Sequence, residues 1–258
     1  SADASAVGSG SAGVGVAIAI NVAKANDHAY LGGSGQVTAA GVSVLAQMAD
    51  ETLPADPKLQ VFSAQATSGA GGAVAIAGSL ALNVAEAKAL AEISPAAKVA
   101  TTGGGGVNLN ARNDTSSTAA AQPEGVGAVS PDSVGVGASV AINISNATTT
   151  AEVGSDVVLT DVGRLSLDAV SNNAATTSAK AGGTAGGSGV GVGGAIALSV
   201  VNNQTTADIA AGTTALLATG PLEAHAVHTG TTTTTADGTA GGGKAGIGIA
   251  LGLNVVTD

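Results

Sequence analysis

The feature that most constrains this chain is a strand-like segment that returns five times. Its first copy, GVGVAIAINV at 13–22, alternates large aliphatic side chains with glycine, alanine and a final asparagine. Alternation with a period of two residues indicates a β-strand, because successive side chains point to opposite faces. The residue that closes the small face of each copy recurs at spacings of 62, 60, 56 and 55 residues, at Asn21, Asn83, Asn143, Ser199 and Asn254.

Two further landmarks follow each of the first four copies in the same order. An Ala-x-aliphatic triplet comes first, at Ala29/Leu31, Ala91/Ile93, Ala151/Val153 and Ala207/Ile209. A short segment follows, which reads VSVLA to Ala46, VNLNA to Ala111, LSLDA to Ala169 and LEAHA to Ala226. A unit that cannot bury both of its faces alone must stack on its neighbours.

We therefore predict an all-β fold, a repetitive β-solenoid or β-helix-like rod with about 56–62 residues per repeat. The whole chain, 1–258, is read as a single array with approximate repeats 8–67, 68–124, 125–181, 182–237 and a partial 238–258. Because the last repeat stops after its first strand, we expect the array to be a piece of a larger protein. One wide coil, two narrow coils or a stack of hairpins per repeat all remain open.

The two faces of the repeated strand differ in size. In the first copy the large face is Val14, Val16, Ile18, Ile20 and Val22, and the small face is Gly13, Gly15, Ala17, Ala19 and Asn21. Glycine inside a strand marks close backbone approach. We expect a thick aliphatic layer to cover the large face and a second sheet to press on the small face. The anchor residues Asn21, Asn83, Asn143, Ser199 and Asn254 would then stack as a structural ladder.

One segment carries a conflicting local signal. Residues 83–93, NVAEAKALAEI, favour a helix by propensity. The corresponding stretches NISNATTTAEV and SVVNNQTTADI are poor helix formers. Because one repeat should have one fold, we predict strand and turn here.

Charge and composition exclude several function classes. The net charge is −10, and the 8 Lys and Arg residues form no cluster. Neutralising a phosphate backbone requires clustered cations, so nucleic acid is excluded as a main partner. The uncharged stretches 66–85 and 181–207 have a period of two rather than a helical period, so we expect no membrane insertion. The chain has no cysteine and therefore no disulfide.

Motifs that resemble active-site chemistry lack their required context. GTAGGGKA at 238–245 has the spacing of a phosphate loop, but Ala245 replaces the magnesium-binding hydroxyl residue and a strand follows instead of a helix. Glu223, His225 and His228 could ligate a metal, but no other repeat keeps them, and we interpret them as surface residues. We predict no catalytic, cofactor-binding or metal-binding residues, no cofactor, and no enzyme activity.

The least repeat-like segment is 47–62, QMADETLPADPKLQVF. Insertions in repeat arrays map to surface loops, often on a binding face. This segment is therefore a candidate partner loop, with Asp50, Glu51, Pro54, Asp56, Pro57 and Phe62 as the candidate residues.

The texture of the repeats resembles that of giant bacterial surface proteins. A VGVG- or AVAI-type strand, an anchor Asn, an Ala-x-Ile triplet and a V-x-L-x-A strand are similar to the repeats of filamentous-haemagglutinin-like and leukotoxin-like filamentous adhesins and of large autotransporter passengers. The resemblance implies an extracellular or bacterial cell-surface location and a structural, adhesive or matrix-forming role. It carries over no site residues.

We therefore expect a structural repeat of an extracellular fibre or filamentous surface adhesin, which stacks on itself and on neighbouring chains through its thin faces and open edges. The alternative is an adhesin binding module that presents loops to a surface glycan or protein. A polysaccharide-active solenoid enzyme and an ice-binding protein with a threonine ladder around 229–237 are weaker alternatives.

Overall fold

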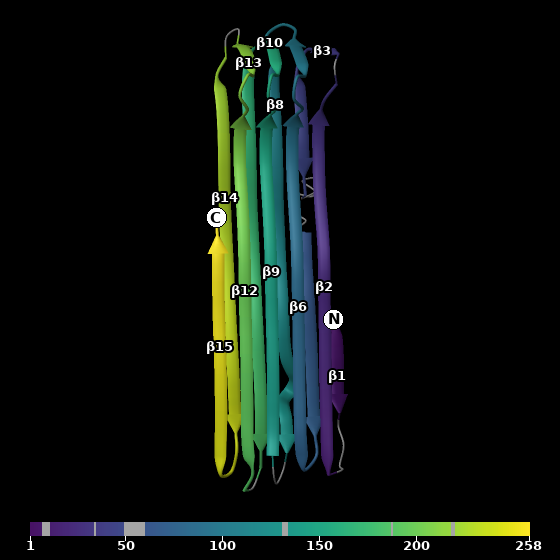
Figure 1. Cartoon of the computed structure of the whole chain (residues 1–258), viewed down its shortest axis with the longest axis vertical. Helices are drawn as coiled ribbons and strands as arrows, with labels where there is room; N and C mark the ends of the chain where they lie inside the picture. Colours follow the sequence, from purple (N-terminus) through teal and green to yellow (C-terminus); the bar gives the residue numbers. More distant parts are fainter. Residues whose placement is uncertain (7–10, 34, 49–59, 131–133, 187, 218–219) are drawn as a thin grey trace.

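The computed structural model describes residues 1–6, 11–33, 35–48, 60–130, 134–186, 188–217 and 220–258. These residues form β-strands joined by short turns, and the strands assemble into three parallel sheets (Figure 1). The described part of the chain contains no helix, and so none that is long and apolar enough to cross a membrane. The prediction of an all-β β-solenoid is confirmed.

Each repeat is one wide coil that passes once through each sheet. We call the three sheets A, B and C and give their strands below. A coil starts with a long strand in sheet B, turns through a short strand in sheet C and returns along sheet A. Sheet B contains β2 (Ala12–Leu31), β6 (Val74–Ile93), β9 (Val134–Val153), β12 (Val190–Ile209) and β15 (Ala245–Thr257). Sheet C contains β3 (Gln36–Ala39), β7 (Lys98–Thr101), β10 (Val158–Val162) and β13 (Thr214–Leu217).

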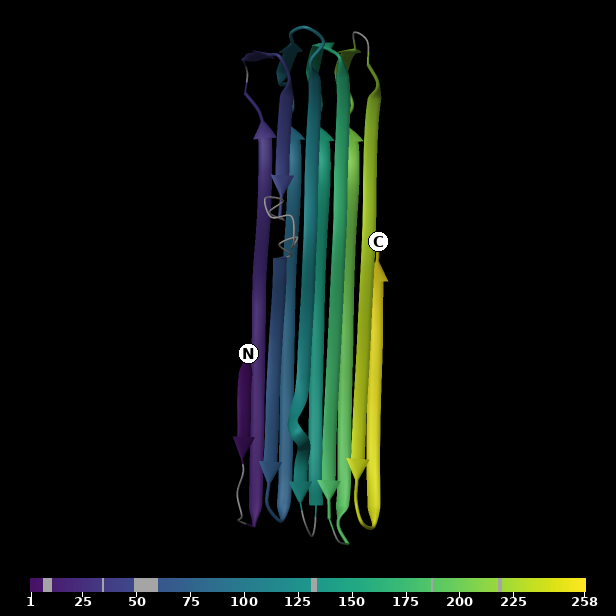
Figure 2. The same ribbon diagram turned by 180° about the vertical axis from the view of Figure 1, so that it is seen from behind.

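Sheet A lies behind sheet B in Figure 1 and in front of it in Figure 2. Its strands are β1 (Ala2–Ala6), β4 (Val42–Gln47), β5 (Gln60–Gly71), β8 (Gly106–Ser130), β11 (Arg164–Ala185) and β14 (Leu222–Gly241). The repeats predicted from the sequence end at residues 67, 124, 181 and 237, and β5, β8, β11 and β14 each continue a few residues beyond these boundaries. In the first coil, β4 and β5 both pair with β8, so together they occupy the place of one long strand.

Residues 83–93 belong to β6, as the repeat argument predicted. Asn83 to Ile93 pair in unbroken register with Asn21 to Leu31 on one side and Asn143 to Val153 on the other. Two complete ladders of backbone hydrogen bonds outweigh a helix propensity of a few tenths of a kcal/mol per residue.

The long dimension of the molecule follows the strands, and the solenoid axis runs across them (Figure 1). A strand of 20 residues spans roughly 66 Å, whereas each added coil extends the axis by only about 4.8 Å. The repeats therefore stack as a pile of wide, flat coils.

The interior between sheets A and B changes in character along the strands. At the end capped by sheet C it holds large side chains that are fully buried, including Ile93, Val99, Leu109, Leu159, Leu165 and Leu167. Midway along the strands its apolar side chains are all alanine, such as Ala81, Ala119, Ala141 and Ala179, and small polar side chains lie among them. At the far end it holds glycine. This gradient brings the two sheets into closer contact with distance from sheet C.

Glycine is needed at the far end because the two sheets are too close there for a Cβ atom to fit between them. A Cβ added to Gly137 would lie 2.2 Å from the carbonyl oxygen of Gly182, and one added to Gly191 would lie 2.2 Å from that of Gly241. The expectation that a second sheet presses on the small face is therefore confirmed, with sheet A as that second sheet.

The expectation of a covered aliphatic face is wrong for the described part of the chain. Ile76 and Ile196, on strands flanked on both sides by other strands, are 42% and 45% exposed. No described segment lies over the outer face of sheet B. The physical reason is that the two sheets bury their small faces against each other, which leaves the large face of sheet B turned outward.

Alanine at Gly137 should test the close contact directly. We expect Gly137→Ala to lower the free energy of unfolding by about 3 kcal/mol or more, because the added methyl meets rigid backbone. Gly194→Ala is the matched control, since an added Cβ there meets nothing within 4 Å. Chemical denaturation measures both variants, and equal losses would contradict the close approach of the sheets.

Candidate functional site

A row of side-chain amides crosses the interior midway along the strands. The Nδ2 atom of Asn21 donates to Oδ1 of Asn83 at 2.7 Å, and Nδ2 of Asn83 donates to Oδ1 of Asn143 at 2.9 Å. Asn83 and Asn143 are fully buried. The bonds run along the solenoid axis and tie each coil to the next at one fixed position.

Sheet A contributes a residue to this row that the sequence analysis did not single out. Ser117 of β8 donates from Oγ to Oδ1 of Asn143 at 2.6 Å and accepts from Nδ2 of Asn83 at 2.8 Å. Asn143 also donates to the backbone carbonyl of Ser117 at 3.0 Å. The amide row therefore joins sheets A and B as well as successive coils.

The row weakens in the fourth coil. Ser199 keeps the register between Asn143 and Asn254 and is fully buried, but its Oγ has no hydrogen-bond partner in the described part of the molecule. Asn254 lies on β15, where both strand faces are exposed. The structure thus brings together Asn21, Asn83 and Asn143, and it places Ser199 and Asn254 in line without a side-chain bond between them.

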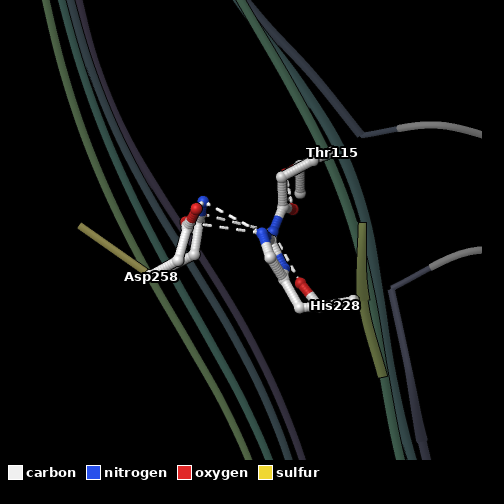
Figure 3. A network of polar contacts seen from close by, with 6 residues as sticks. Thr115, His228 and Asp258 are labelled. Carbon is white, nitrogen blue, oxygen red and sulfur yellow. Dashed lines mark hydrogen bonds and ion pairs between the residues drawn. The ribbon is translucent and has the colours of Figure 1, made fainter. Parts of the chain in front are cut away.

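A second polar row lies nearer to sheet C, because Asn203 is closer than Ser199 to the end of β12. Figure 3 shows the row from close by, with Thr115, His228 and Asp258 labelled. Thr115 donates to Oδ1 of Asn173 at 2.5 Å, and Asn173 donates to Oδ1 of Asn203 at 3.4 Å. Asn203 in turn donates to Oδ1 of Asp258 at 2.8 Å and lies 3.4 Å from Nε2 of His228. The landmarks of the repeat did not indicate this row, because its positions carry different residue types. Thr115 pairs with Asn173 within sheet A, and Asn203 of β12 bonds to Asp258, the residue after β15.

The candidate metal group is not assembled. Glu223 pairs with Arg164 on the outer face of sheet A, whereas His228 points inward and its Nε2 lies 3.5 Å from Oδ1 of Asp258. Within the described ranges, no three His, Asp or Glu side chains gather as a metal site. Residues 238–245 run from the end of β14 through a turn into β15, so no helix follows the glycine-rich stretch.

The candidate partner loop falls mostly outside the described residues, which exclude Asp50, Glu51, Pro54, Asp56 and Pro57. Phe62 is described, and its side chain is only 8% exposed within the large-residue core. Its ring therefore packs inside the solenoid. The described flanks place the insertion between Met48, whose amide donates to the carbonyl of Arg112, and Gln60, which pairs with Thr115.

Most of the exposed large hydrophobic side chains among the described residues lie on the outer face of sheet B, which we call the aliphatic face. It consists of six rows of side chains that cross the five strands of sheet B in register. In the strand order β2, β6, β9, β12, β15 the rows are Ala12/Val74/Val134/Val190/Ala245, Val14/Ile76/Val136/Val192/Ile247, Val16/Gly78/Ala138/Gly194/Ile249, Ile18/Leu80/Val140/Ile196/Leu251, Ile20/Leu82/Ile142/Leu198/Leu253 and Val22/Val84/Ile144/Val200/Val255.

The aliphatic face ends abruptly along the strands. The next row is Lys24, Glu86, Asn146, Asn202 and Thr257, and the Nζ atom of Lys24 lies 2.6 Å from Oε2 of Glu86. A contiguous apolar patch bounded by polar residues marks an interaction site.

The outer face of sheet A is polar. One row of hydroxyls is regular and runs through Ser63, Thr118, Thr176 and Thr233. The structure thus aligns these residues better than the sequence comparison of the repeats indicated. The row is one residue wide, because its neighbours include Val61 and Ala174 on one side and Gln65 and Ala120 on the other.

Comparison with protein-family models, with curated proteins and with solved structures gives no match.

Replacing the central amide should test the role of the first polar row. We expect Asn143→Leu to cost roughly 2–4 kcal/mol of unfolding free energy, because Asn83 and Ser117 lose a buried acceptor. Asn172→Leu, at an exposed position on the outer face of sheet A, is the matched control and should change stability little. If thermal and denaturant unfolding give the same stability for both variants, the amide row does not hold the coils together.

Proposed function

We propose that this chain is a structural repeat of an extracellular fibre or filamentous surface adhesin, in which wide coils stack on one another to build the fibre body. The observation that supports this most is the register between coils. β6, β9 and β12 pair residue for residue over their full common length, with no bulge in sheet B.

The interior supports the same proposal. Its two polar rows run along the solenoid axis, and three of their side-chain bonds join one coil to the next, from Asn21 to Asn83, from Asn83 to Asn143 and from Asn173 to Asn203. Such rows favour the stacking of like units, because a coil that carries the matching amide can bond to the coil before it. The thin glycine and alanine faces are occupied inside the molecule, so stacking between chains would use open coil edges or outer faces instead.

A loop-presenting adhesin is the second candidate. Its support is that, among the coils as far as they are described, the first alone has its long sheet A strand divided in two, β4 and β5, on either side of residues 49–59. Insertions in regular repeat proteins often carry a binding site for a glycan or a protein.

Electron microscopy of the native material, with diffraction and mass per length, tests the proposal. We expect fibres with an axial spacing of about 4.8 Å and strands across the axis. At 23.8 kDa for 258 residues, one coil of about 58 residues per 4.8 Å gives about 1.1 kDa per Å for a single array. Discrete particles that never elongate, or fibres without the axial spacing, would contradict a fibre body.

A further inference from the structure

The aliphatic face has a groove along its third row. Gly78, Ala138 and Gly194 stand where the flanking rows carry valine, isoleucine or leucine, and the result is a shallow hollow beside Leu80 and Val140. Larger side chains close the groove at both ends of the array, Val16 on β2 and Ile249 on β15. The groove runs along the solenoid axis.

A ridge lies directly beside the groove. The fourth row, Ile18, Leu80, Val140, Ile196 and Leu251, carries a branched aliphatic side chain on every strand. Groove and ridge are parallel and adjacent. Consider a two-fold axis that lies in the plane of the face, between groove and ridge and parallel to both. Rotation about this axis would place the ridge of one copy in the groove of the other. An isologous interface requires this kind of self-complementarity.

The same axis passes through the centre of the whole aliphatic face. The face has six rows, and the axis lies between the third and the fourth. The rotation therefore places the first row of one copy opposite the sixth row of the other, and the second row opposite the fifth. Every apolar row then meets an apolar row, and strands of the two copies run antiparallel. The polar row that begins with Lys24 and Glu86 falls beyond the edge of the partner's apolar rows.

The size of the face suits a stable pair. Five strands about 4.8 Å apart and six rows about 6.6 Å apart give a footprint of about 24 Å by 40 Å, or about 950 Å² per copy. Specific interfaces bury about 800 Å² per partner. The strands show little twist in Figures 1 and 2, so two such faces can meet over their full extent.

We propose that two copies of this chain pair through their aliphatic faces, with antiparallel strands and with the ridge of each copy seated in the groove of the other. The pair adds to the proposed fibre a lateral contact between two solenoids. Pairing does not require elongation, so a chain that pairs but forms no fibre would contradict the proposed function and leave the pair intact.

Single cysteines test the geometry, since the chain has none of its own. Val134 in the first row should face Ile144 of the other copy, which lies in the sixth row of the same strand. We expect a mixture of Val134→Cys and Ile144→Cys chains to be joined by a short bifunctional thiol reagent. Neither variant alone should cross-link, because the axis separates each residue from its own copy by roughly 33 Å.

Each other result of this experiment overturns the proposal. Cross-linking of Val134→Cys with itself would mean parallel strands, and no cross-link in any mixture would mean that the aliphatic face belongs to another occupant, such as a further segment of a longer chain. Sedimentation velocity of the unmodified chain must also show a dimer, and a monomer at all concentrations would contradict the pair.

A charge on the ridge gives an independent measurement. We expect Val140→Lys to weaken the dimer roughly 100-fold or more, because the ammonium would be buried in an apolar contact. Val170→Lys is the matched control, since Val170 lies on the outer face of sheet A and should leave the dimer unchanged. Circular dichroism checks that both variants keep their strands. Equal dimer affinity for the two folded variants would exclude the aliphatic face as the interface.

The chain's charge fixes the expected effect of salt. Each copy carries a net charge of −10, which repels the other copy, whereas the aliphatic face itself is uncharged. Added salt screens the repulsion and leaves the apolar contact intact. Dimer affinity should therefore rise with ionic strength, and a fall would indicate an interface held by ion pairs elsewhere.

Discussion

The close contact between the small faces of sheets A and B is the constraint on which the rest of this structure depends. Glycine and alanine let the two sheets approach until a single methyl at Gly137 would collide with the carbonyl of Gly182. At this separation, only small or flat polar side chains can occupy the interior beyond the region near sheet C. The large residues of the long strands must therefore point outward.

The same contact makes register costly to change. A slip of one residue in a long strand of sheet B would turn isoleucine and valine into an interior that has no room for them. The amides of Asn21, Asn83 and Asn143 add a second penalty, because a slipped strand would leave buried polar atoms without partners. Sterics and hydrogen bonding thus select one stacking arrangement, which explains how coils with different outer residues keep the same inner geometry.

Much of this fold could be predicted from the sequence, since alternation and spacing are local signals that the parallel register preserves. Asn21 and Asn83 hold the same place in successive repeats, 62 residues apart, and the parallel register brings their side chains into hydrogen-bond contact. The outward direction of Val14 or Ile76 could not be predicted by the usual rule that large apolar residues lie inside, because that rule assumes an interior wide enough to hold them. The strands of sheet C escaped notice because they have four or five residues each and share only one apolar position, the second residue of each strand. The row from Thr115 to Asp258 is also hidden in the sequence, since its residue types differ from coil to coil and its bond from Asn173 to Asn203 joins opposite sheets.

The great width of each coil relative to its thickness has a mechanical consequence. A load along the strands shears several hydrogen-bonded ladders at once, each up to 20 residues long. A load along the solenoid axis acts instead on one coil edge at a time, and the coil at the end peels away first. Each peeled coil would release roughly 200 Å of extended chain in place of the about 4.8 Å that it contributed to the stack. A surface built from such coils would resist stretching in one direction and, in the other, yield stepwise and absorb the work of extension.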